Sequence, residues 1–160
     1  MAELTNLESK LAEVLGLAAA AKTATEKVKG MLDEEEQDLA SVLERMNQEA
    51  AETEERCTEL AGTFDGKKTA IVEAARETRH EAEEMMRTYL ADEEEALDGF
   101  EFLTMAEAGE VGHWAIVKRL NEKAGNPRVQ ELVDWALPVQ EAHLSSVLES
   151  SLALAGREDP

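Results

Sequence analysis

Apolar residues recur at intervals of three and four along almost the whole chain, and this spacing constrains the fold more than any other feature. In the first segment they are Leu4, Leu7, Leu11, Val14, Ala18, Ala21 and Val28. Residues three and four apart lie on one face of an α-helix. Runs of β-branched residues are absent and only three prolines occur, so the spacing predicts helix nearly throughout. We therefore expect an all-α fold.

Turn signals divide the chain into expected helices at about residues 4–29, 33–60, 67–90, 96–123 and 127–154. Asp33 with Glu36 resembles an acidic capping box, and the string GNP at residues 125–127 places a terminal glycine before a first-turn proline. A second acidic string at 92–95 echoes the first. The echo suggests two hairpins, one from the second and third helices and one from the fourth and fifth. Alternatively, the third and fourth segments form one bent helix.

The formal net charge of −20 restricts the partners of the chain. Nucleic acids and anionic membranes are themselves negative and would be repelled, whereas cations would be attracted. No apolar stretch is long enough to cross a bilayer. Residues 14–21 lack the basic start and apolar core of a signal peptide. Cys57 is the single cysteine, so no disulfide framework is expected. We expect a cytoplasmic protein.

Ionisable residues interrupt the apolar face of the fourth expected helix. At 100° per residue, Glu110 falls at the centre of that face, with Glu107 and His113 about 60° to either side. The face itself is formed by Phe100, Leu103, Ala106, Trp114, Val117 and Leu120. Burying an unpaired charge costs several kcal/mol unless a metal ion or hydrogen bonds compensate it. These three residues are therefore candidate ligands.

The fifth expected helix repeats this arrangement. Gln140 lies at the centre of its apolar face and His143 about 60° away. Glu141 lies on the flank of that face, and Pro138 removes one helical hydrogen bond just before the cluster. Equivalent clusters on two successive helices predict that their polar groups face each other. The alternative interpretation is a buried histidine hydrogen-bonded to a glutamate or a carbonyl.

The first half of the chain offers weaker candidates. Glu77 and His80 are three apart, but His80 lies nearly opposite the apolar face of the third expected helix, which indicates a solvated pair. Glu81 is the best inward acid on that helix. On the second expected helix, Glu49 is the nearest inward acid.

Residues 106–114 (AEAGEVGHW) and 137–143 (LPVQEAH) resemble the ferritin-like superfamily, the rubrerythrin and bacterioferritin type of four-helix bundle, and within it a small bacterial branch. Members pair a helix bearing Glu with a helix bearing Glu-x-x-His, twice, to hold two irons. By this resemblance, Glu107 and Glu110 are the carboxylates of the third bundle helix and His143 is the histidine of the fourth. Gln140 stands where rubrerythrin-like members have Glu. His113 is an addition to the pattern, and the first half of the chain matches poorly.

The resemblance implies a ferritin-like bundle at residues 31–156, preceded by an accessory N-terminal helix at 1–30 and followed by a disordered tail at 157–160. The expected metal ligands are Glu81, Glu107, Glu110, His113, Gln140 and His143. The expected metal is iron, as one ion or a di-iron centre, with zinc or manganese as substitutes, serving oxidase or peroxidase chemistry or iron handling. We expect a homo-oligomer, dimer or larger. The alternative function is a non-catalytic, metal-free helical-bundle interaction protein whose inward polar groups fix the helix register.

Overall fold

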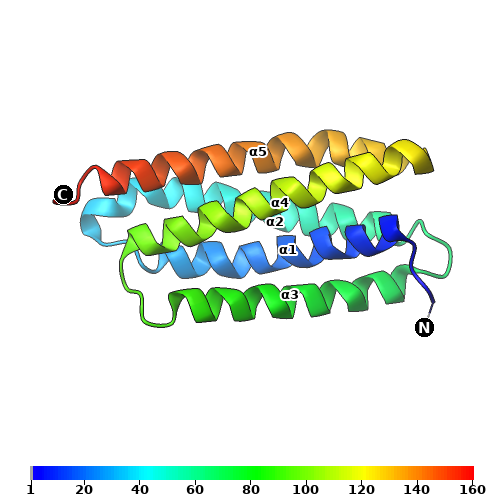
Figure 1. The fold of residues 1–160 in the computed structure, drawn as a ribbon, viewed down its shortest axis with the longest axis horizontal. Coiled ribbons are helices and arrows are strands. Elements are labelled where there is room, and N and C mark those ends of the chain that lie inside the picture. Colours follow the sequence, from blue (N-terminus) through cyan, green and yellow to red (C-terminus); the bar gives the residue numbers. More distant parts are fainter. Residues whose placement is uncertain (1) are drawn as a thin grey trace.

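A computed structural model describes residues 2–160; Met1, at the start of the predicted accessory segment, lies outside the described residues. The helices are α1 (Asn6–Lys29), α2 (Ala40–Ala61), α3 (Lys68–Leu90), α4 (Ala96–Ala124) and α5 (Pro127–Ala155), with a 3₁₀ helix, η1 (Glu34–Leu39), before α2 (Figure 1). The part of the chain so described contains no strand, which confirms the all-α class. None of the helices in residues 2–160 combines the length and apolar character needed to span a membrane.

Side-chain caps mark the starts of α1, η1 and α5. The Asp33 carboxylate accepts from the backbone N–H of Glu35 and Glu36, and Glu36 accepts from the Asp33 N–H, so the predicted capping box forms at the start of η1. The similar acidic string at residues 92–95 does not cap a helix, because Glu95 at the start of α4 makes no side-chain capping bond. A further box, Thr5 with Glu8, starts α1.

The break between α4 and α5 follows the sequence prediction. Gly125 ends α4 with a φ of 65°, a conformation that glycine adopts without steric cost. The Asn126 side chain accepts from the N–H of Arg128 and Val129 and caps α5. Helix α5 then continues through Pro138. Helices α3 and α4 are separate, so the alternative of one bent helix does not hold.

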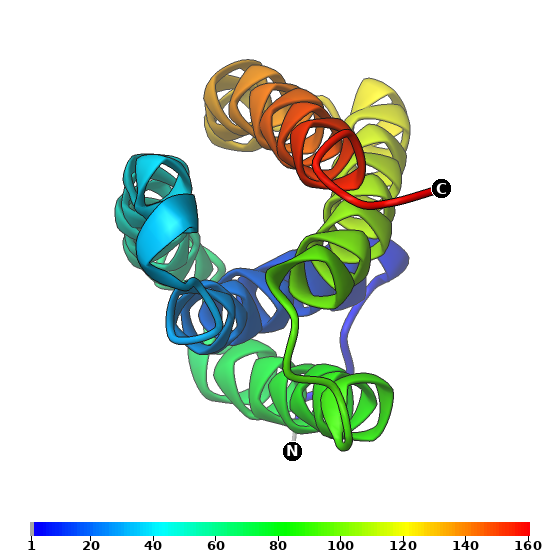
Figure 2. The same ribbon diagram turned by 90° about the vertical axis from the view of Figure 1, so that its left-hand side faces the viewer.

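Helices α1, α2, α5 and α4 pack around one long axis, and α3 lies on the outer side of α1 (Figure 2). Helix α1 therefore contacts α2, α3 and α4, whereas the sequence analysis expects residues 1–30 to be accessory. The small buried residues Gly16, Ala18 and Ala19 allow neighbours to approach α1 from more than one side. Of the two predicted hairpins, α4 with α5 is confirmed; α2 with α3 is wrong, because α1 contacts both along their length.

The interior contains two hydrophobic cores. One includes Trp114 and Val133, and the other includes Phe100 and Val147. Along α4 and α5, the residues between the two cores are polar and buried. They are Glu107, Glu110, Gln140 and His143, here named the central polar layer. The layer therefore separates two apolar halves of the bundle.

Candidate functional site

Helix α4 supplies two carboxylates to the central polar layer. Glu107 and Glu110 are three residues apart on the inward face of α4, and they are 1% and 4% exposed. The inward orientation expected from the apolar periodicity is therefore observed for both. Two neighbouring acids removed from water need hydrogen-bond donors, a proton or another cation.

Helix α5 supplies the donor that holds these carboxylates. With its amide assigned so that the nitrogen faces α4, Gln140 donates to Glu107 Oε2 at 2.7 Å and to Glu110 Oε2 at 3.2 Å. The neighbours of Gln140 fix this amide orientation, because the opposite one would place its carbonyl oxygen against two carboxylates. A single amide nitrogen thus serves both acids and joins α5 to α4.

His143 lies between carboxylates from two different helices. Its Nδ1 is 3.6 Å from Glu107 Oε2 on α4, and its Nε2 is 3.5 Å from Glu49 Oε1 on α2. Both separations exceed the length of a good hydrogen bond, and Nε2 has no hydrogen-bond partner although it is fully buried. His143 therefore connects α2, α5 and α4 electrostatically. The sequence analysis noted Glu49 as the inward acid of its helix but did not include it among the ligands.

The layer is electrostatically unusual because it contains more acid than base. Burial raises the pKa of Glu110 well above its usual value of 4.5, and the adjacent charge of Glu107 raises it further. Burial also raises the pKa of the Cys57 thiol on α2, with smaller contributions from Glu110 and Glu54. The protonated forms of Glu110 and Cys57 are therefore favoured in the folded protein.

Two of the predicted ligands lie away from the layer. His113 is on the flank of α4 that faces α1, where its Nδ1–H donates to the Gly109 carbonyl at 2.8 Å and its Nε2 is 3.2 Å from Glu13 Oε2. Glu81 is exposed, because α3 buries only a narrow face against the bundle. The predicted solvated position of His80 is observed, and its Nε2 lies 3.3 Å from Glu84 Oε1.

A metal ion requires several ligands that converge on one point. Among residues 2–160, no three His, Cys, Asp or Glu side chains form a group that could hold one. At His143, Glu107 faces Nδ1 and Glu49 faces Nε2, so the two carboxylates address opposite sides of the ring. As placed, the layer does not fit a metal, because the two ring nitrogens of His143 each face a different carboxylate and no three ligands converge on one point.

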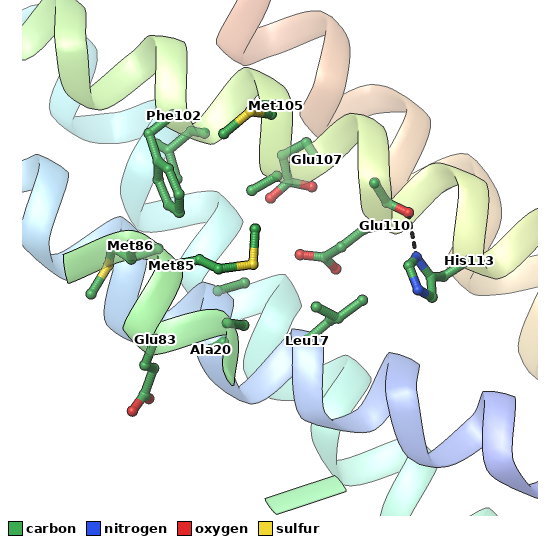
Figure 3. Close-up of a pocket in the computed structure, with 16 residues that line it drawn as sticks. Leu17, Ala20, Glu83, Met85, Met86, Phe102, Met105, Glu107, Glu110 and His113 are labelled. Atoms are coloured by element: carbon green, nitrogen blue, oxygen red, sulfur yellow. Dashed lines mark hydrogen bonds between the residues drawn. The ribbon is translucent and has the colours of Figure 1, made fainter. Parts of the chain in front are cut away.

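A pocket of about 240 Å³ lies next to the layer, between α1, α3 and α4. Its walls are mainly alanine, leucine, methionine and phenylalanine side chains, and Glu107 and Glu110 belong to its lining. In Figure 3 the Glu110 carboxylate points toward Met85 of α3 and lies above Leu17 of α1. Met85 and Met105 are 63% and 50% exposed, so the pocket reaches the surface beside them. Sequence periodicity gave no signal for this pocket.

Comparison of the chain with protein-family models, with curated proteins and with solved structures finds no match. The ferritin-like resemblance therefore stays a prediction from the two sequence segments.

Proposed function

We propose that this chain acts through binding rather than catalysis, as a helical-bundle protein whose central polar layer fixes the pairing of α2, α4 and α5. The observation that carries the proposal is the Gln140 amide, which donates to both Glu107 and Glu110 across the α4–α5 interface. A buried polar group that is satisfied in only one register disfavours every alternative register. His143 adds Glu49 of α2 to the same set of contacts.

The environment of Cys57, the single cysteine of the chain, also supports a non-catalytic role. Cys57 is buried, and its raised pKa leaves little thiolate at neutral pH. The thiolate is the reactive form of cysteine.

The test replaces three of the four residues of the layer by leucine, in a Glu107→Leu, Glu110→Leu, Gln140→Leu variant. A matched control changes three exposed residues, Glu101→Leu, Glu122→Leu and Gln48→Leu. Apolar replacement of buried charge is often neutral or stabilising, so we expect thermal stability at least equal to wild type. Loss of register should give several oligomeric species by light scattering and broadened methyl NMR spectra. A single species with sharp spectra would refute the register role.

Exposed leucines on α5 support a further part of the proposal, a homo-oligomer. Leu148 and Leu152 are 47% and 65% exposed, and neighbouring exposed apolar groups are typical of protein contacts. Light scattering of the wild type measures this directly. A monomer at high protein concentration would contradict it.

A bound cation is the second candidate, and it carries the ferritin-like prediction. Its support is the unpartnered Nε2 of His143 together with two acids that share one amide donor. To hold iron, or zinc or manganese in its place, Glu49 and Glu107 would have to move so that both coordinate an ion bound to one ring nitrogen of His143. Elemental analysis of untagged protein after iron supplementation tests this. Stoichiometric metal, and a lower thermal midpoint in EDTA, would favour the cation over the metal-free layer.

A further inference from the structure

The pocket between α1, α3 and α4 has an apolar body and an acidic end. Its apolar part is lined by small side chains of α1, such as Ala20 and Ala24, and by larger ones of α3 and α4, such as Met85, Met105 and Phe102. An engineered cavity of about 150 Å³ holds one benzene ring. The 240 Å³ pocket is therefore large enough for one ring and a short chain.

The charges at the pocket are of one sign. No Lys or Arg is among the described residues that line it. Glu83, at its margin, already accepts from Arg79 at 2.9 Å and from Thr23 at 3.1 Å. His113 is engaged by the Gly109 carbonyl and Glu13. Of the acids that line the pocket, Glu107 and Glu110 therefore have free capacity to accept hydrogen bonds.

These two acids have more acceptor capacity than the protein uses. A carboxylate has about four lone-pair sites, yet the side-chain donor to both groups is the one Gln140 nitrogen. A ligand that brings N–H donors and a positive charge to this end of the pocket would satisfy both the hydrogen-bonding and the charge requirement.

We propose that this pocket binds an amphipathic amine, with its ammonium group donating to Glu110 and Glu107 and its apolar body lying among Met85, Met105 and Phe102. An anionic amphiphile would meet like charge in a low-dielectric site. The ammonium group stabilises the charged form of Glu110, which burial alone disfavours; a neutral amphiphile would not, and a hydrated metal ion gains nothing from the apolar walls. The inference rests on the proposed binding role, but not on the register role of the layer.

The experiment compares three probes with the same apolar body and different heads: 4-phenylbutylamine, 4-phenylbutan-1-ol and 4-phenylbutyrate. Binding is measured by calorimetry in EDTA at physiological salt, and the site by methyl NMR of the methionines. We expect the amine to bind about tenfold or more tightly than the alcohol, and the butyrate to bind most weakly. The methyl shifts should be confined to Met85, Met86 and Met105, with Met46, which does not line the pocket, unaffected.

Variants locate the two halves of the site. Glu110→Gln should reduce amine affinity to that of the alcohol, whereas Glu101→Gln, the same change on the exposed face of α4, should leave it unchanged. Ala82→Phe fills the pocket from α3 and should abolish binding of both amine and alcohol. Circular dichroism confirms that each variant is folded. Equal affinity for the three probes, absence of binding, or equal loss in Glu101→Gln would overturn the proposal. None of these outcomes depends on the number of oligomeric species in the apolar-layer variant, so the two proposals fail separately.

Discussion

Replacing Gly16 by alanine should weaken the attachment of α3 to the bundle. Gly16 lies on α1 where the backbone of α3 comes closest. A Cβ at this position would lie 2.4 Å from the Ala75 carbonyl oxygen and 2.8 Å from Thr78 Cβ. The nearest atom belongs to a helix backbone, so it cannot rotate away as the end of a side chain could. Helix α3 must instead move outward as a body.

The magnitude follows from two opposing effects. Alanine is about 1 kcal/mol more favourable than glycine inside a helix. Overpacking a buried contact costs about 1–3 kcal/mol, occasionally more, and a backbone clash more than 1 Å short of the ordinary 3.4–4 Å contact belongs at the upper end. We expect a net loss of about 1–2 kcal/mol, which lowers the thermal midpoint of a protein this size by about 2–8 °C.

The control is Gly112→Ala on α4, where an added Cβ meets nothing within 4 Å. That change should stabilise the protein by about 1 kcal/mol at most. Urea unfolding followed by circular dichroism measures both variants. Equal stabilisation by the two substitutions would refute the reasoning, because it would mean that α3 does not approach α1 at Gly16.

Three further predictions concern single groups. The folded-state pKa of Glu110 lies above its unfolded value of 4.5, so the native protein holds more protons than the unfolded chain above that pH. Stability should therefore fall as the pH rises above about 4.5 toward the raised folded-state pKa of Glu110, with the Glu107 carboxyl and Cys57 thiol as the other titratable groups facing Glu110. Glu110→Gln should flatten this slope in urea titrations, and an unchanged slope would contradict the assignment. The Cys57 thiol should react with a disulfide reagent only after urea is added, because burial raises its pKa; rapid reaction of the native protein counts against its buried position. Asn126→Ala removes the cap of α5 and should cost about 1 kcal/mol in thermal unfolding, whereas Asn6→Ala, one residue beyond the cap of α1, should have little effect.

Except for the start of α2, which a 3₁₀ helix delays to Ala40, the helix boundaries could be predicted because their signals are local. The Gly125 to Pro127 break and the Asp33 capping box depend on backbone conformation and on neighbours within four residues. The inward position of Glu107, Glu110, Gln140 and His143 could also be predicted, because each interrupts a strong apolar face. These inferences require no knowledge of which helix lies opposite.

The arrangement of the helices could not be predicted in the same way. The resemblance implied an accessory helix at residues 1–30, whereas the small residues of α1 allow contacts with three neighbours. His113 lies on the flank of α4, and only the position of α1 decides that it faces Glu13. Glu81 is exposed because α3 packs on one side alone. Each of these outcomes depends on contacts between distant segments.

The division of the interior has a consequence for cooperativity. A rod with one continuous core would protect its backbone amides from exchange as one unit. In this bundle the apolar contacts around Phe100 and those around Trp114 are separated by two acids. These acids, Glu107 and Glu110, share the Gln140 amide as a hydrogen-bond donor. Sub-global opening of either end can therefore stop at Gln140 without exposing the opposite core. Two sets of amides with different opening free energies, meeting near the middle of α4 and α5, are the expected signature in native-state hydrogen exchange.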